Sequence, residues 1–306
     1  MKPQHVIIIL NNGSGLEDGP ERKAKIAERF EHHGIPASFV TFDPGADLEK
    51  TAKDTALKSP NSTIVASGGD GTISGVSAGL AGLSNQFGMI ASGTFNYFAR
   101  SLNLPETVEE AIDVIARGKI RPTGIAMIND KVFLNNASIG AYAAILQTRE
   151  GIYKRWGRSR VAAYWSVVKA LATLRAPLKL TVTYDGKSFN HRTPIVFAIS
   201  NAFQLNQMGL SGEDCIANGR MVLLIAPDTN RWGLLKHAAA LAFGVAKRQT
   251  DYQMHCSSEF TLEMSHKSRA VARDGELARM NGPFKLSMRP NALNLIVPEA
   301  FDEPVR

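Results

Sequence analysis

The first 120 residues of the chain alternate between short apolar runs and longer amphipathic stretches. Short apolar runs bounded by turn residues are typical of buried strands, whereas longer stretches with helical spacing are typical of helices. The alternation predicts βαβ units and a parallel sheet, whose ligands bind at the carboxyl ends of its strands. The expected strands are Val6–Leu10, Ala37–Phe42, Thr63–Ala66 and Phe87–Ala91, and the expected helices are Glu21–His33, Ala46–Lys58, Ile73–Leu83 and Glu106–Arg117.

After about residue 120 the pattern changes, and alternating or β-branched residues predict a mainly antiparallel second domain. The dipeptide Asp185-Gly186 is a hairpin signal within it. We expect domains at residues 1–122 and 123–289, with a strand and tail at 290–306 that one interpretation returns to the first domain. The expected strands are Ile120–Met127, Lys131–Ala137, Leu178–Tyr184, Ile195–Ser200, Met221–Ile225, Glu259–Met264, Phe284–Met288 and Leu293–Val297, with helices at Arg160–Leu174 and Arg231–Ala246.

Composition and charge narrow the class of protein only slightly. Hydrophobic residues make up 44% of the chain and charged residues 21%, which are ordinary globular values. No apolar run approaches the roughly 18–20 residues of a membrane-spanning helix. The net charge of +7 is compatible with nucleic acid, an anionic membrane surface or phosphorylated ligands. Cys215 and Cys256 have no metal-binding spacing and cannot form a disulfide framework, so a reducing cytoplasm is the expected location.

The strongest chemical signal is the segment Gly68, Gly69, Asp70, Gly71 and Thr72, which stands between an apolar strand and a helix. Glycines let backbone N–H groups approach phosphate oxygens closely, and a helix N-terminus favours negative charge. Because Asp70 would repel a polyphosphate unless a cation intervened, we expect it to bind Mg²⁺ directly or through water. The alternative interpretation is a tight turn in which Thr72 caps the helix.

Two further polar segments follow other strands of the same predicted sheet. Each is a weak signal alone and could be an ordinary strand-to-helix turn. Because the carboxyl ends of parallel strands meet at one edge, the three segments would line a single crevice. The two segments contain Gly93, Thr94, Asn96 and Arg100 after the fourth strand, and Asn11, Asn12, Gly13, Ser14 and Gly15 after the first.

A fourth segment, far along the chain, carries two carboxylates. Asp274 and Glu276 flank Gly275 in a β-rich region. A phosphoryl-transfer enzyme needs positioning, a metal ion and a group that accepts the acceptor's proton, which either carboxylate could be. A plain Asp-Gly hairpin turn is the alternative.

Together these segments resemble the diacylglycerol kinase catalytic-domain family, which includes soluble bacterial diacylglycerol kinases, YegS-like lipid kinases, and sphingosine and ceramide kinases. The resemblance covers nearly the whole chain. Its glycine–aspartate loop is shared with NAD kinases and phosphofructokinases, whereas the later motifs are more specific to the lipid kinases. In chain order the motifs are Gly68–Thr72, Gly93–Asn96 with Phe98–Arg100, Asn135–Gly140, and Asp274–Glu276 with Arg289–Leu293.

The resemblance implies a fold, a reaction and a set of site residues. The fold would be a Rossmann-like α/β nucleotide domain joined to an antiparallel β-sandwich domain, with the site in the cleft between them. The reaction would be ATP- and Mg²⁺-dependent phosphorylation of a lipid hydroxyl in phospholipid biosynthesis. Glu276 matches the family's proton acceptor, with Asp274 supporting it. By the same resemblance ATP would contact Asn11 to Gly15, Thr41, the loop from Gly68 through Ile73 to Ser74, and Thr94.

The chain also departs from the family pattern. The first loop reads Asn-Asn-Gly-Ser-Gly where the family usually has Asn-Pro, and Tyr97 replaces a common acidic residue. Asn218 and Arg220 stand where many bacterial members have an Asp-Gly that helps to bind a structural metal. We therefore expect no second, structural Mg²⁺ in the Cys215–Arg220 segment.

Residues 153–160 interleave four basic residues with two aromatic ones. Such a cluster suits a membrane interface, where rings lie at headgroup depth and cations meet anionic lipid. We expect this segment to make peripheral contact with the inner face of an anionic membrane, and a solvated loop is the alternative. A lipid substrate is the expected partner, nucleic acid is not expected, and a homodimer is left open.

Two other functions remain as alternatives. The first is an NAD kinase-like enzyme with a soluble acceptor. NAD kinases usually carry an Asn-Glu pair after the glycine–aspartate loop, and here Asn96 precedes Tyr97 and Asn136 precedes Ala137, which argues against it. The second is a catalytically inactive regulator that binds nucleotide or lipid. The retained carboxylates argue against that, while the altered first loop keeps it open.

Overall fold

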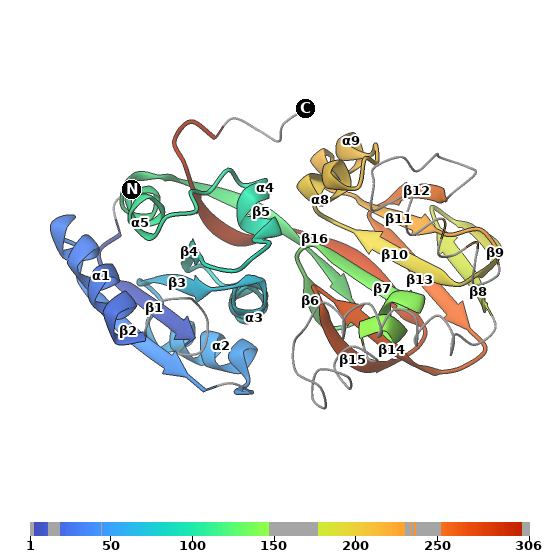
Figure 1. Cartoon of the computed structure of the whole chain (residues 1–306), viewed down its shortest axis with the longest axis horizontal. Coiled ribbons are helices and arrows are strands. Elements are labelled where there is room, and N and C mark those ends of the chain that lie inside the picture. Colours follow the sequence, from blue (N-terminus) through green and yellow to red (C-terminus); the bar gives the residue numbers. More distant parts are fainter. Residues whose placement is uncertain are drawn as a thin grey trace. The chain divides into compact units, whose positions relative to one another are not determined.

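The computed structural model describes residues 3–11, 19–43, 45–146, 177–229, 233, 236 and 252–301. The chain divides into two compact units (Figure 1): an amino-terminal unit of residues 1–125 and 289–306, and a carboxy-terminal unit of residues 126–288. Several predictions fall outside the described residues. They are the helices at Arg160–Leu174 and Arg231–Ala246, the cluster at 153–160, and the loop residues Asn12 to Gly15.

A parallel sheet forms the centre of the amino-terminal unit. Its strands are ordered β2-β1-β3-β4, and every neighbouring pair is parallel. Continuous apolar runs produce these strands; all six residues of β3, for example, are buried. The strands are β1 (Val6–Asn11), β2 (Ala37–Phe42), β3 (Thr63–Gly68) and β4 (Gln86–Ala91).

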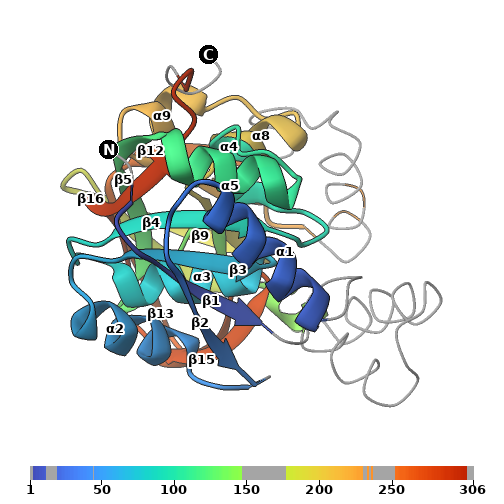
Figure 2. The same cartoon turned by 90° about the vertical axis from the view of Figure 1, so that its left-hand side faces the viewer.

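Helices pack against this sheet. Ile26 of α1 and Ile112 of α5 pack in one core with Val6, Ile8 and Leu10, the alternate residues of β1 that face them. Figure 2 shows α1 and α5 in front of the strands, while α2 and α3 pack against each other. The helices are α1 (Gly19–His32), α2 (Leu48–Lys58), α3 (Asp70–Leu80), α4 (Tyr97–Ser101) and α5 (Val108–Arg117).

The carboxy-terminal unit contains two antiparallel sheets around a shared apolar core. One sheet has the order β12-β11-β10-β7-β14-β15, and in the other β13 lies between β16 and the β8-β9 hairpin. Val196 and Leu223 from the first sheet pack in the same core as Phe260 and Phe284 from the second. The strands of the first sheet are β7 (Asn136–Gly140), β10 (Ile195–Ile199), β11 (Met221–Ile225), β12 (Gln253–Ser257), β14 (Ser268–Arg273) and β15 (Glu276–Asn281).

The remaining elements complete this unit or link it to the first. Strand β16 pairs antiparallel with β13 near its start and parallel with β4 near its end, so it contributes to both units. The elements are β5 (Lys119–Ile128), β6 (Lys131–Phe133), β8 (Leu178–Tyr184), β9 (Lys187–Thr193), β13 (Glu259–Met264), β16 (Phe284–Val297), α8 (Ala202–Gln207) and α9 (Glu213–Ala217).

The predicted fold class, an α/β unit followed by an antiparallel β unit, is confirmed. Three details differ. The strand expected at Lys131–Ala137 is two strands, β6 and β7, interrupted at Leu134 and Asn135. The strands expected at Phe284–Met288 and Leu293–Val297 are one, β16. The polar strands β9, β12, β14 and β15 carry no clear hydrophobic pattern and were not predicted.

The two cysteines correct another expectation. Cys215 of α9 and Cys256 of β12 form a disulfide, with their Cα atoms 5.9 Å apart. They are 41 residues apart in the sequence, and residue spacing alone gives no sign that α9 and β12 lie together. The expectation that the cysteines cannot form a disulfide framework overlooked this single bridge, and the inference of a reducing compartment from them loses its support.

Candidate functional site

The predicted nucleotide residues that can be placed lie at one edge of the parallel sheet. Leu10 of β1 is in register with Thr41 of β2 on one side and with Ser67 of β3 on the other. Gly68 at the end of β3 is in register with Ala91 at the end of β4. The strand ends that carry Asn11, Thr41, Gly68 and Ser92 therefore meet at the carboxyl edge.

The glycine loops after β3 and β4 are packed backbone against backbone. The N–H of Ser92 donates to the carbonyl of Gly68 at 2.9 Å. A methyl group placed on Gly93 would lie 2.9 Å from the Cα of Gly69, which is closer than side chains normally come. Glycine is required at this contact because a side chain would hold the two loops apart.

Asn96 joins the same two loops through both its backbone and its side chain. Its N–H donates to Oδ2 of Asp70 at 2.9 Å, and its Oδ1 accepts from the N–H of Gly93 at 2.9 Å. It has a left-handed backbone with φ of 48° and is only 5% exposed. Asparagine tolerates this left-handed conformation better than most residues do. The backbone conformation and the side-chain hydrogen bond therefore both favour asparagine at this position.

The start of α3 presents its first turn at this edge. Gly69 is the N-cap residue and provides no side-chain cap, and the first intrahelical bond runs from Ile73 N to Gly69 O at 3.1 Å. N–H groups of a first turn lie outside the intrahelical ladder and point toward any anion placed there. The hydroxyl of Thr72 is packed beside Gly68, and the Ile73 side chain is fully buried.

The surroundings of Asp70 include an aromatic pair. Burial raises the pKa of the Tyr97 hydroxyl, and the nearby Asp70 carboxylate raises that pKa further. Phe95, 59% exposed, stacks on Tyr97 with ring centroids 5.5 Å apart. Arg100 forms an ion pair with Glu106 at 2.8 Å, so it is already partnered by a carboxylate. Thr94 is exposed beside this pair.

Sequence reasoning missed a buried cation behind the glycine loop. Arg22 in the first turn of α1 is 5% exposed, and its Nη2 donates to Oγ of Ser67 at 3.1 Å. Ser67 is fully buried and directly precedes Gly68. The charged run at Glu21–Lys25 is typical of an exposed helix start. Only the tertiary packing shows that Arg22 is buried.

The residues at this edge fit a magnesium ion of the kind that accompanies a nucleotide. Within the described ranges, no group of three His, Cys, Asp or Glu side chains is placed to hold a metal by itself. Mg²⁺ commonly binds through one or two carboxylates and completes its shell with phosphate oxygens and water. The half-buried carboxylate of Asp70, held at a helix start, meets that requirement.

In the carboxy-terminal unit, Asp274 is a structural anchor. Its carboxylate accepts from the backbone N–H groups of Leu134 at 2.8 Å, Asn135 at 2.8 Å and Asn136 at 3.1 Å. Its own N–H donates to the carbonyl of Asn136 at 3.0 Å. Asp274 and Gly275 also form the hairpin turn between β14 and β15 with positive φ angles of 45° and 87°. The turn interpretation is therefore correct in geometry, and the side chain adds a fixed link to the segment before β7.

Glu276 has a different environment. It is the first residue of β15, is exposed and pairs across the hairpin with Arg273. Its side chain forms no hydrogen bond or ion pair with the other residues that the structure describes. Its position follows from the hairpin that Asp274 fixes.

Buried amides support the segment that binds Asp274, and two of them were not predicted. Nδ2 of Asn201 donates to Oδ1 of Asn135 at 2.7 Å, and Nδ2 of Asn136 donates to Oε1 of Gln204 at 3.1 Å. Asn201 caps the short helix α8 that carries Gln204. Hydrogen-bonded buried amide pairs of this kind help to fix the local structure. Oδ1 of Asn136 is buried and has no hydrogen-bond partner among the described residues.

Residues 5–128 match the family model described as "Diacylglycerol kinase catalytic domain", which spans both glycine loops. Through these residues, the chain is similar to the diacylglycerol kinase catalytic-domain family. It is 35% identical over 185 residues to the diacylglycerol kinase of Bacillus subtilis (strain 168), covering 60% of each chain. It is 37% identical over 144 residues to the probable lipid kinase YegS-like of Cronobacter sakazakii, covering 46% of this chain and 47% of that one.

The chain thus spans about half to 60% of the length of these curated relatives. The fold is shared more widely than the sequence. The crystal structure of a diacylglycerol kinase from Bacillus anthracis str. Sterne superposes with a TM-score of 0.70 at 19% identity, covering 99% of this chain and all of that one. This likeness shows that the two proteins share their fold over nearly the whole of this chain. No helix among the described residues is long and apolar enough to cross a bilayer.

Proposed function

We propose that this protein belongs to the diacylglycerol kinase family and is an ATP-dependent lipid kinase that phosphorylates a lipid hydroxyl. The observation that carries the proposal is the pair of glycine loops joined by the Asp70–Asn96 bond at the carboxyl edge of the sheet. Close glycine backbones, a helix start and one carboxylate together suit a nucleotide polyphosphate with its cation.

The polyphosphate of ATP is proposed to bind at the first turn of α3, against Gly69 and Gly93. Asn11 to Gly15, which begin at the last residue of β1, and Thr41 near the end of β2 would contact the rest of the nucleotide, with Thr94 at the second loop. Asp70 would hold Mg²⁺ directly or through water. When bound, that ion neutralises charge on the phosphate oxygens.

Glu276 is proposed to accept the proton of the acceptor hydroxyl. A bond forms between the acceptor oxygen and the γ-phosphorus, and the bond from that phosphorus to the β–γ bridging oxygen breaks. The hydroxyl proton passes to the Glu276 carboxylate, and ADP leaves. Asp274 acts as a positioning residue here, because both of its oxygens accept backbone hydrogen bonds.

The acceptor class is proposed from the relatives, which are named as a diacylglycerol kinase and a lipid kinase. A diacylglycerol-like hydroxyl is the first substrate to test, in the setting of phospholipid biosynthesis. Peripheral contact with an anionic membrane through the cluster at 153–160 belongs to this proposal. An NAD kinase-like activity and a binding-only regulator are its competitors.

The decisive experiment incubates the purified protein with radiolabelled ATP, Mg²⁺ and a total lipid extract, with NAD in a parallel reaction. The expected result is a labelled lipid and unlabelled NAD. Label on NAD alone would replace the lipid kinase by its soluble-acceptor competitor, and nucleotide binding without any transfer would favour the regulator. Glu276→Gln should abolish the transfer, whereas Glu259→Gln, an exposed glutamate on β13, should leave it unchanged.

A further inference from the structure

A recess in the carboxy-terminal unit lies at the other end of the hairpin from Asp274. It forms where β8 and β14 begin and where β13 and β15 end. Its volume of about 510 Å³ falls within the roughly 300–1,000 Å³ of small-molecule sites. The lining residues are Pro177, Lys179, Ser265, His266, Ser268, Arg269, Ala270 and Arg279.

The charge of this recess is one-sided. Lys179, Arg269 and Arg279 are basic, and no carboxylate is among the lining residues. None of the three forms an ion pair with an Asp or Glu in the described part of the chain. The Nε of Arg269 is buried and has no hydrogen-bond partner there either. A buried donor without an acceptor is costly, so an acceptor supplied by a ligand would relieve that cost.

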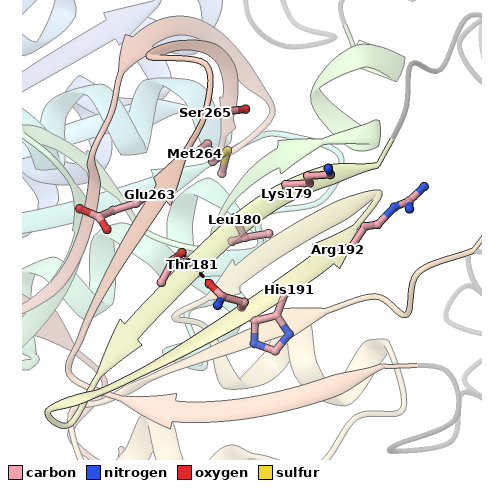
Figure 3. A pocket seen from close by; sticks show the side chains of 9 residues that line it. Lys179, Leu180, Thr181, His191, Arg192, Glu263, Met264 and Ser265 are labelled. Carbon is pink, nitrogen blue, oxygen red and sulfur yellow. Dashed lines mark hydrogen bonds between the residues drawn. The ribbon is translucent and has the colours of Figure 1, made fainter.

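A second groove of about 660 Å³ adjoins the recess and shares Lys179 and Ser265 with it. In this groove Lys179 of β8 lies directly opposite Arg192 of β9. Like charges in a direct cross-strand pair repel each other. Asp228 offsets Arg192 through a 3.2 Å ion pair, and Lys179 is left facing the recess. Figure 3 shows Lys179 and Arg192 on one side of the groove and Glu263 on the other.

We propose that this recess binds the phosphate group of an anionic ligand through Lys179, Arg269 and Arg279. The two guanidinium groups can each present paired N–H donors to phosphate oxygens, and the ammonium group adds a third charge. Ser265 and Ser268 line the same space and can donate hydroxyl hydrogen bonds. The same chemistry is offered by the headgroup of an anionic phospholipid and by soluble phosphate. The site requires no phosphoryl transfer, so it stands or falls separately from the proposed kinase activity.

The first experiment titrates inorganic phosphate into the full-length protein by calorimetry. Arg269→Gln with Arg279→Gln should weaken binding by about tenfold or more, because two charge-assisted contacts are lost. Lys187→Gln with Lys285→Gln removes the same charge from exposed positions on β9 and β16 and should leave the affinity unchanged. Equal phosphate affinity in the wild type and the Arg269/Arg279 variant would overturn the proposal, unless vesicle binding depends on these arginines.

The second experiment identifies the source of the phosphate. Vesicles of phosphatidylglycerol in phosphatidylcholine are sedimented with each protein, and vesicles of phosphatidylcholine alone are the blank. Loss of anionic-vesicle binding in the Arg269/Arg279 variant supports a lipid headgroup, and loss of phosphate binding alone supports a soluble ligand. If neither measurement responds, the recess binds no phosphate. Lys179→Gln, at an exposed side chain, repeats the test where misfolding is not a concern.

Discussion

The carboxylate of Asp70 accepts a 2.9 Å hydrogen bond from the backbone N–H of Asn96, 26 residues further along the chain. The bond ties the helix start after β3 to the loop after β4. One oxygen of Asp70 is therefore used to hold the two glycine loops together. The same side chain is the proposed partner of the cation, so its structural and chemical roles can be separated only by a substitution that keeps its shape.

Asp70→Asn is such a substitution. An amide oxygen can still accept from Asn96, so the free energy of unfolding should change by no more than about 1 kcal/mol. The lost charge should lower kcat by about 10²–10³-fold, because the developing charge in the transition state loses its stabilisation. Urea unfolding and ATP turnover measure the two effects. Full turnover in this variant would remove Asp70 from the proposed site, and Asp130→Asn, at an exposed turn, is the matched control.

The contact between the glycine loops predicts an order for two alanine substitutions. A methyl group on Gly93 would meet Oδ1 of Asn96 at 2.8 Å and Cα of Gly69 at 2.9 Å, whereas one on Gly69 would come no closer than 3.4 Å to Gly93. Gly93→Ala should therefore destabilise the protein by about 1–3 kcal/mol, and Gly69→Ala by less. Nucleotide affinity should fall in the same order. The reverse order in urea unfolding would contradict the packing described for these loops.

Loss of the charge on Asp274 should chiefly lower the stability of the protein, whereas loss of the charge on Glu276 should chiefly lower its activity. Asp274→Asn removes an anion that accepts three backbone hydrogen bonds, and about 2–3 kcal/mol of stability should be lost. Glu276→Gln changes an exposed side chain and should alter stability by less than about 0.5 kcal/mol. Its activity should nevertheless be abolished. Stable, active Glu276→Gln protein would show that another group accepts the proton.

The ion cluster at Asp113 predicts a dependence of stability on pH. Its carboxylate binds Arg29 Nε at 2.9 Å and His33 Nε2 at 2.6 Å, and the Arg29 bond chiefly lowers the pKa of Asp113, with His33 adding to it. The unfolded chain therefore takes up this proton at a higher pH than the folded protein does. The stabilisation is present above the ordinary aspartate pKa of about 3.9 and is lost as pH falls through the lowered value.

Asp113→Asn should accordingly cost about 1 kcal/mol at neutral pH, as expected of a partly exposed ion pair. The difference from wild type should shrink as the solution is acidified. Urea unfolding at a series of pH values measures it, with Asp130→Asn as the control. A difference that does not vary with pH would mean that packing between α1 and α5, and not charge, accounts for the loss.

Sequence predicts the buried elements of this fold well and the half-exposed ones poorly. The residues of β3 are apolar or small because both faces of that strand are covered. Strand β9, by contrast, is an edge strand with four consecutive exposed residues, and its sequence Lys187–Thr193 shows no alternation. The sequence predicts two strands in place of β16 because Arg289, Pro290 and Asn291 are exposed and interrupt the apolar pattern. These residues lie between the part of β16 that pairs with β13 and the part that pairs with β4.

The residues of the candidate site likewise differ in how far the sequence predicts them. The order of strands brings Gly68 and Gly93 together, and a βαβ pattern is enough to predict that. The bonds of Asp274 to Leu134 and Asn136 join segments 138 to 140 residues apart, and no local pattern records such a link. Arg22 is missed for a related reason: its helix start looks solvent-exposed in sequence, and only the packing of α1 against β3 buries it.

The pairing of β16 with β4 has a consequence for biosynthesis. The ribosome releases the amino-terminal residues first, and isolated domains usually begin to fold as they emerge. Here Asn294 and Leu295 of β16 pair with Gln86 and Phe87 of β4. The parallel sheet of the amino-terminal unit therefore stays incomplete, with the edge of β4 unpaired, until residue 297 has been translated. We expect chaperones to contact the unpaired edge of β4 during synthesis. A ribosome stalled before β16 should carry an incomplete and protease-sensitive amino-terminal unit.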